Sequence, residues 1–94
     1  MPRVRIPAPL RQHADGQREV AVAGTTLGEV LRALTERWPG LRPRLLDGDG
    51  GLHPFVSVFV DGEDVRLLQG LQTPLRADAE VTILPSMAGG AERP

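Results

Sequence analysis

The chain contains no cysteine, and this absence excludes several kinds of chemistry at once. Without a thiol, its 94 residues can form no disulfide framework, hold no thiolate-bound metal and supply no cysteine nucleophile. Lysine is absent as well, so all 11 basic residues are arginine. The chain therefore offers no side-chain amine for acylation, for a Schiff base or for an isopeptide bond.

An excess of positive charge and a long apolar run are also missing. The 11 basic residues are balanced by 12 acidic ones, whereas a nucleic-acid-binding domain usually carries a basic excess or a basic stripe. No apolar segment approaches the roughly 18 residues that a membrane span requires. Arg3, Arg5 and Arg11 interrupt the N-terminal segment, which therefore lacks the apolar centre of a secretion signal. We expect a cytoplasmic protein that binds neither nucleic acid nor a membrane.

What is present fits one small globular domain, since 40% of the residues are hydrophobic and 24% are charged. Residues 3–8 alternate polar and apolar side chains, and residues 19–22 return after an Asp15-Gly16 turn, which predicts a β-hairpin. Thr26 and Glu29 have the spacing of a capping box, in which the Thr26 hydroxyl accepts from the Glu29 N–H and the Glu29 carboxylate reaches back to the cap. One amphipathic helix should follow, ended by Pro39-Gly40, with an apolar face made of Leu27, Val30, Leu31, Leu34 and Trp38.

The second half predicts the remaining strands. In residues 55–60 we expect Val56, Val58 and Val60 to face the helix and Phe59 to face outward. Asp61-Gly62 predicts a tight turn, residues 65–68 a short partner strand, and residues 70–75 a loop with a buried leucine. Residues 81–84 predict the last strand, stopped by Pro85. The order indicates an α+β domain, a mixed sheet of four to five strands covered by one main helix.

Patterns typical of catalysis or metal binding are scarce. His13 and His53 lie 40 residues apart, and we expect surface positions for both rather than a metal site. Residues 47–51 lack the spaced acidic ligands and the terminal glutamate of a calcium loop. Asp61, Glu63 and Asp64 fall on a predicted turn, where solvated carboxylates are expected rather than an acid–base pair. We therefore expect no catalytic residue and no metal or cofactor bound by this chain.

The segment after Pro85 carries the most informative pattern. Ser86-Met87-Ala88 leads into Gly89-Gly90, and a lone glycine pair is common at frayed ends. Residues without a Cβ can also enter a narrow channel and bring a carboxylate to a nucleotide's α-phosphate. Fully extended, residues 86–90 reach about 17 Å. We expect residues 1–85 to form the domain, residues 86–90 a flexible tail, and residues 91–94 a removable extension.

Residues 70–75, 78–85 and 88–90 together resemble the C-terminal half of MoaD/ThiS-type sulfur carriers, which are ubiquitin-like β-grasp proteins. Residues 52–66 and 84–90 are similar to the branch of that family that serves cysteine biosynthesis, and the resemblance extends over about residues 3–90. Two positions differ from the family pattern. Ala79 stands where a glycine is usual, which should tighten that loop, and Gly-Gly is followed by residues 91–94.

The resemblance implies a carrier protein rather than an enzyme. An ATP-dependent activating enzyme would adenylate the Gly90 carboxylate, and a sulfur donor would displace AMP to leave a thiocarboxylate. A PLP-dependent cysteine synthase would accept the sulfur, and a JAMM-type zinc metalloprotease would hydrolyse the resulting Gly90–cysteine amide. ATP, PLP and zinc would then belong to the partner enzymes.

The resemblance also assigns roles to individual residues. Ala88, Gly89 and Gly90 would thread into the partner, and the docking surface would consist of Phe59, Leu84, Pro85 and Met87. Because the Gly90 carboxylate is joined to Ala91, we expect a protease to cut between these two residues before activation.

Three alternatives remain open at this point. The carrier could donate sulfur to molybdopterin, thiazole or secondary-metabolite (thiosugar-type) biosynthesis. It could instead be a ubiquitin-like protein modifier joined through Gly90 to a lysine of another protein. It could also be a β-grasp binding module without covalent chemistry.

Overall fold

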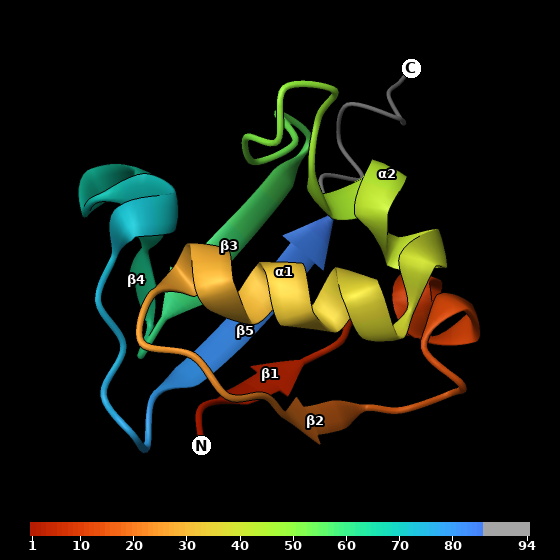
Figure 1. Cartoon of the computed structure of the whole chain (residues 1–94), viewed down its shortest axis with the longest axis horizontal. Helices are drawn as coiled ribbons and strands as arrows, with labels where there is room; N and C mark the ends of the chain where they lie inside the picture. The colour runs from red at the N-terminus through yellow and green to blue at the C-terminus, as the bar shows by residue number, and fades with distance from the viewer. Residues whose placement is uncertain (86–94) are drawn as a thin grey trace.

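Five strands form one mixed sheet in the order β2-β1-β5-β3-β4 (Figure 1). The structure is a computed structural model that describes residues 1–85. The central strands β1 and β5 run parallel, whereas the other neighbouring pairs are antiparallel. The strand bounds are β1 Arg3–Arg5, β2 Glu19–Ala21, β3 Val56–Val60, β4 Glu63–Asp64 and β5 Glu80–Pro85.

Helix α1, Leu27–Arg37, lies across one face of this sheet, as predicted (Figure 1). The Thr26 hydroxyl accepts from the backbone N–H of Glu29 at 3.2 Å. The Glu29 carboxylate accepts from the backbone N–H and the hydroxyl of Thr25, at 2.7 and 2.9 Å, so it contacts the residue before the cap rather than the cap itself. The whole predicted apolar face, Leu27, Val30, Leu31, Leu34 and Trp38, is buried.

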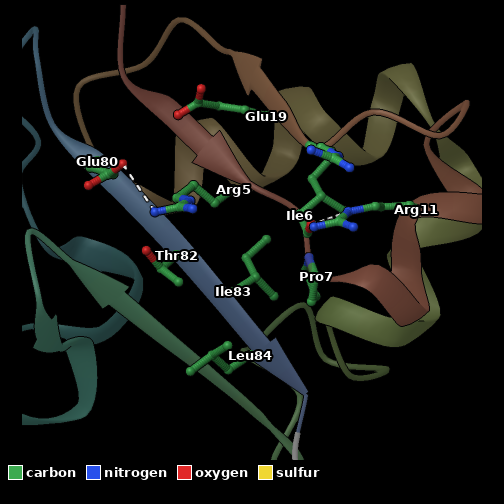
Figure 2. Close-up of a pocket in the computed structure, with 10 residues that line it drawn as sticks. Arg5, Ile6, Pro7, Arg11, Glu19, Glu80, Thr82, Ile83 and Leu84 are labelled. Carbon is green, nitrogen blue, oxygen red and sulfur yellow. Dashed lines mark hydrogen bonds and ion pairs between the residues drawn. The ribbon is translucent and has the colours of Figure 1, made fainter.

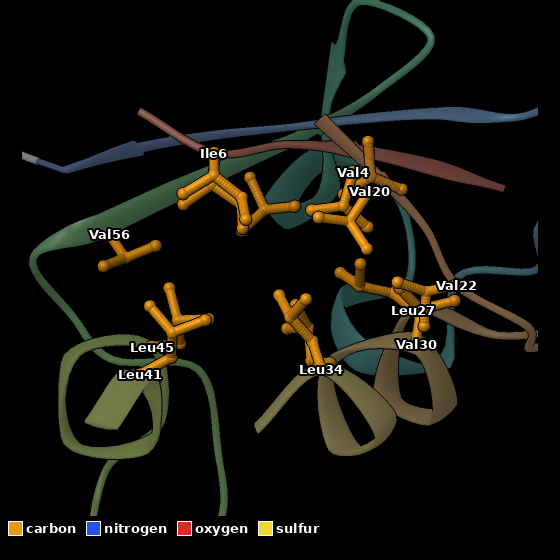
Figure 3. Close-up of a cluster of buried hydrophobic side chains, with 14 of the residues drawn as sticks. Val4, Ile6, Val20, Val22, Leu27, Val30, Leu34, Leu41, Leu45 and Val56 are labelled. Atoms are coloured by element: carbon orange, nitrogen blue, oxygen red, sulfur yellow. The ribbon is translucent and has the colours of Figure 1, made fainter. Parts of the chain in front are cut away.

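The core fills the space between α1 and the inner face of the sheet (Figure 3). Val56, Val58 and Val60 point into it, as expected, while Ser57 and Phe59 lie half-buried on the opposite face. A 3₁₀ turn, Pro39–Leu41, and helix α2, Arg42–Leu45, close one end of the core. Leu45 and Leu46 are buried at this edge of the core, and neither helical segment was predicted.

The first predicted strand is too long, and the connection after it is not a tight turn. β1 ends at Arg5, and a 3₁₀ helix, Ala8–His13, follows. Pro7 and Pro9 cannot donate to a ladder, and their fixed φ suits the first turn of a helix. Asp15 and Gly16 do turn the chain, with φ of 54° and 76°. The Trp38 indole N–H donates to the Asp15 carboxylate at 2.8 Å and fixes this long connection to the end of α1.

The partner strand predicted at residues 65–68 is also wrong. The Asp61-Gly62 turn is confirmed, with φ of 51° and 89°, and it pairs Val60 directly with Glu63. Strand β4 therefore begins directly after the two-residue turn, at Glu63. Residues Val65–Leu67 form a 3₁₀ turn instead, which begins where the Asp64 carboxylate accepts from the Arg66 N–H at 2.8 Å.

The loop before β5 accounts for the alanine at position 79. Ala79 is fully buried, and its N–H donates to the Arg76 carbonyl at 3.0 Å while its carbonyl accepts from the Arg3 N–H at 2.9 Å. The backbone φ of Ala79 is not positive, so this position does not need the conformational freedom of a glycine. The predicted buried leucine of the preceding loop is Leu75. Strand β5 then includes Pro85, which pairs with Val56, rather than stopping before it.

Candidate functional site: the outer sheet face and the end of β5

Strand β5 carries the candidate site, because the chain continues from its last residue toward Gly90. It lies in the middle of the sheet, between β1 and β3. The predicted sulfur attachment at Gly90, the threading residues Ala88 and Gly89, the processing bond to Ala91 and the docking residue Met87 all lie outside the described residues. The structure therefore shows the surroundings of this segment's starting point.

Two of the predicted docking residues share the outer face of the sheet. Phe59 pairs with Thr82, and Leu84 pairs with Ser57, so all four side chains project from the same face. Leu84 is 47% exposed, which is unusual for a leucine in a central strand. Phe59 and Leu84 are diagonal neighbours on this face, and we call these two side chains the apolar strip, which leads to the end of β5.

Pro85 lies apart from that strip. It pairs with the buried Val56, so it alternates with Leu84 and does not share its face. Pro85 lines a separate hollow of about 260 Å³ together with Leu10, Arg44 and Phe55. The end of β5 therefore contacts two different surfaces, the outer face through Leu84 and this hollow through Pro85.

Phe55 is a candidate contact residue that the sequence reasoning missed. It was expected to be the first residue of a strand, but β3 begins at Val56 and the Phe55 side chain is 61% exposed. Its ring lies 5.5 Å from that of His53, centroid to centroid. The signal was present in the sequence, since Pro54 has no N–H to donate to a ladder and therefore places the next residue at the start of the strand.

A groove of about 510 Å³ extends along β1 and β5 on the outer face (Figure 2). Its charged lining residues are Arg5, Arg11, Arg18, Glu19 and Glu80, and Leu84 lines it at the end of β5. The Arg5 guanidinium lies 3.8 Å from the Glu80 carboxylate, but both side chains are largely exposed. Such a pair contributes at most about 1 kcal/mol, so it leaves both groups open to a partner. Sequence reasoning missed this groove because its residues come from three separate segments.

The Arg66 side chain hydrogen-bonds to the backbone at the start of β3. Its guanidinium donates to the Val56 carbonyl at 2.7 Å and to the Pro54 carbonyl at 3.3 Å. Strand β4 pairs only with Phe59 and Val60, so these carbonyls belong to a part of β3 that β4 does not cover. Arg66 thereby satisfies an open strand edge next to the candidate site.

Histidine and acidic side chains make hydrogen bonds within their own loops. No group of three or more histidine or acidic side chains suited to a metal ion occurs within residues 1–85. His53 Nδ1 accepts from the Phe55 N–H at 3.1 Å, and the Asp47 carboxylate accepts from the N–H groups of Asp49 and Gly51, both at 2.9 Å. These side chains stabilise their own loops. In the same residues, no helix has the length and apolar character needed to cross a membrane.

Comparison with known proteins identifies the family. The model of the ThiS family matches residues 4–90. The chain belongs to the ThiS family. The ubiquitin-like family resemblance seen in the sequence is thus confirmed, and the match ends at the second glycine of Gly89-Gly90.

Relatives of this ThiS-family chain agree in sequence and structure. The sulfur carrier protein CysO of Mycobacterium tuberculosis is 45% identical over 89 residues, covering 93% of this chain and 96% of the relative. The Amycolatopsis orientalis BexX/CysO complex contains a chain with 35% identity and a TM-score of 0.86, over 92% of this chain and 96% of the other. Small archaeal modifier protein 1 of Methanosarcina acetivorans has 29% identity and a TM-score of 0.86, over 95% of both chains. These neighbours confirm the predicted β-grasp fold.

Proposed function

We propose that this protein is a CysO-type sulfur carrier whose cargo is held as a thiocarboxylate on Gly90. The observation that supports it best is the extent of the ThiS-family match, which includes the Gly-Gly pair and ends at residue 90. The 45% identity to the sulfur carrier CysO over nearly the whole chain supports the same function. Cysteine biosynthesis is the proposed destination of the sulfur.

The proposed chemistry needs a free carboxylate at Gly90. That carboxylate attacks the α-phosphate of ATP on an activating enzyme, which releases pyrophosphate and forms an acyl-adenylate. A sulfur nucleophile then attacks the acyl carbon, and AMP leaves with the electron pair of the broken C–O bond. This chain contributes the acyl group and the docking surface, while ATP, PLP and zinc are held by the activating enzyme, the cysteine synthase and the metalloprotease.

The domain's role is to present residues 86–90 while staying outside the partner's channel. Those five residues span at most about 17 Å when extended, so the enzyme must contact the surface around the end of β5. We propose that Phe59 and Leu84 make this contact through the apolar strip, and that Pro85, from the separate hollow, and Met87 contribute to the same docking surface. The crystal structure of the Amycolatopsis orientalis BexX/CysO complex supports the idea that a carrier of this type associates with a partner protein.

Residues 91–94 are proposed to be removed before activation. Gly90 is joined to Ala91 by a peptide bond, and an amide carbonyl cannot be adenylated as a carboxylate can. The metalloprotease that hydrolyses the Gly90–cysteine amide also cuts an amide after Gly90, so one enzyme could perform both steps.

Intact-mass spectrometry tests this function. Two forms of the protein, one ending at Gly90 and one carrying residues 91–94, are incubated with ATP, sulfide and the activating enzyme of the same organism. Only the form ending at Gly90 should show the mass change of a sulfur-for-oxygen exchange. Gly90→Ala should slow the exchange by about tenfold or more, because a methyl group must enter the narrow channel. Gly48→Ala, in a loop where an added Cβ meets nothing within 4 Å, is the matched control.

Two results would contradict the proposal. Modification of the longer form at the same rate would show that removal of residues 91–94 is not required. An unchanged mass in both forms, with an enzyme that is active on its own carrier, would favour a non-covalent binding module.

A protein modifier is the second candidate function, favoured by the similarity to small archaeal modifier protein 1. In that case Gly90 would be joined to the lysine of another protein, because this chain has no lysine of its own. Mass spectrometry of tryptic peptides from the native cell separates the two functions. A modifier leaves a remnant of its C-terminus on lysines of other proteins, whereas a carrier is recovered with a thiocarboxylate.

A further inference from the structure

Arginine side chains flank the end of β5 on both sides. The groove on the outer face is lined by Arg11 and Arg18 and, at the end of β5, by Leu84. In the hollow on the other side, Arg44 lies with Pro85. The 3₁₀ helix Ala8–His13 joins the two surfaces, because its Arg11 lines the first and its Leu10 the second. We call Arg11, Arg18 and Arg44 the arginine collar.

Acidic side chains gather at the other end of the same strand. Asp78 precedes β5, Glu80 begins it, and the Asp61 carboxylate accepts from the Glu80 N–H at 3.0 Å. Glu63 follows the adjacent turn. Along β5, Glu80 lies about 10 Å from Ile83, which is level with Arg18, and about 17 Å from Pro85, beside which Arg44 lies. Arg3 and Arg76 lie at this end too, and Arg76 is 3.6 Å from the Asp78 carboxylate. Four carboxylates against two arginines leave this end acidic, whereas residue 86 follows the end of β5 that carries the collar.

The collar is available to a partner. Arg18 and Arg44 are exposed, and within residues 1–85 neither side chain makes a hydrogen bond or an ion pair. Arg11 uses its Nε to donate to the Ile6 carbonyl at 3.0 Å, which positions the guanidinium and leaves its terminal nitrogens toward the groove. Of the two acidic residues in the same groove, Glu80 lies at its other end, in register with Arg3. Glu19 is the neighbour of Arg18, but its carboxylate lies 4.0 Å from the Arg3 guanidinium.

We propose that the arginine collar docks on an acidic rim around the channel of the activating enzyme that receives Gly90. This inference rests on the function proposed above and specifies the charge of the partner surface. Opposite charges at the rim of an interface mainly accelerate association and orient the encounter. The end of the domain that carries the collar would be attracted to the acidic rim of the enzyme's channel, and the acidic end would be repelled from it. The domain would then approach with residues 86–90 facing the channel.

Association kinetics by surface plasmon resonance test the proposal, with the activating enzyme that modifies the wild-type form ending at Gly90. The double variant Arg18→Glu/Arg44→Glu should lower the association rate constant about tenfold at low ionic strength and leave the dissociation rate within about twofold. Raising the salt concentration from about 50 to about 300 mM should remove most of the difference. Arg32→Glu/Arg76→Glu, an equal charge change at exposed positions away from the end of β5, is the control and should stay within about twofold of wild type.

The outcomes separate this proposal from the proposed function. If no activating enzyme modifies the wild type, the carrier function fails and the collar proposal fails with it. If the wild type is modified but the Arg18/Arg44 variant associates as fast as wild type, or the control double variant is equally slow, the collar proposal alone is overturned. Binding of a short single-stranded DNA at about 150 mM salt as tightly as the enzyme would instead assign the arginines to nucleic acid. Circular dichroism melting of each variant shows whether it is folded.

Discussion

At the scale of single residues, Glu29 connects the start of α1 to the segment before it. Its carboxylate accepts from the N–H and the hydroxyl of Thr25, and these hydrogen bonds hold the pKa of Glu29 below its ordinary value, with a smaller contribution from the Arg32 charge. The unfolded chain lacks these donors, so it binds the proton at a higher pH than the folded one. Glu29 therefore stabilises the fold above the ordinary carboxyl pKa, and this contribution is lost as the pH falls through the lowered pKa.

We predict that Glu29→Gln lowers the free energy of unfolding at pH 7, and that its difference from wild type shrinks when the pH falls below about 4. Urea unfolding at both pH values measures this. Glu36→Gln, on the same helix and also exposed, is the control. An equal loss for Glu29→Gln at both pH values would show that the charge of the carboxylate is not what matters.

Gly24 is the second residue with a definite role, since a Cβ there would lie 2.7 Å from Val30 Cγ2 and 3.0 Å from the Val30 nitrogen. The backbone before α1 can thus pass close to the helix only without a side chain. Gly24→Ala should cost about 1–3 kcal/mol, a melting-temperature loss of several degrees. In Gly48→Ala the added Cβ meets nothing within 4 Å. This variant should melt within a degree or two of wild type, a change of about 0.3 kcal/mol in the free energy of unfolding. Equal melting of the two variants would mean that the chain before α1 moves aside without cost.

At the scale of elements, strand β3 has one face in the core and one face on the outer side of the sheet. Val58 is fully buried beneath α1, whereas Phe59 is half-buried on the outer face between Thr82 and Asp64. We predict that Phe59→Ala slows thiocarboxylation by the activating enzyme about tenfold while costing about 1 kcal/mol of stability or less. Val58→Ala should show the reverse: it should lose about 2 kcal/mol of folding stability, while its folded molecules are thiocarboxylated at the normal rate. Calorimetry and the thiocarboxylation assay measure the two effects, and a Phe59→Ala protein that melts like Val58→Ala but is modified normally would contradict the prediction.

The elements also show which parts of the fold the sequence predicts. The apolar period of α1 and the alternation in β3 are local signals, and both elements form as expected. Residues 6–8 were mistaken for strand because Ile6 and Ala8 continue the alternation, while the prolines decide the backbone. The 3₁₀ helix that begins at Ala8 was not predicted. Helix α2 is a single turn, held by burial of Leu41 and Leu45. Four residues are too few to show a helical repeat of apolar side chains, so this helix could not be predicted without the residues that it packs against.

At the scale of the whole molecule, the candidate site was predictable in part. Gly89-Gly90 is visible as a motif, and Leu84 follows from the position of the last strand. The arginine collar was not predictable, because Arg18 and Arg44 are 26 residues apart in sequence and approach the same strand end only through the folded chain. Net charge conceals this arrangement, since a total near zero is also what two opposed clusters give.

The parallel pairing of β1 and β5 has a mechanical consequence. Arg3, Val4 and Arg5 lie beside Glu80, Val81 and Thr82, and the two strands begin at the same end of the sheet. A force that draws the chain from its C-terminal side, against the N-terminal strand, therefore acts along both strands and loads their hydrogen bonds together in shear. Bonds loaded together must break together, whereas bonds at a peeled edge break one after another. The fold is thus built to resist traction on the segment that a partner enzyme would grip.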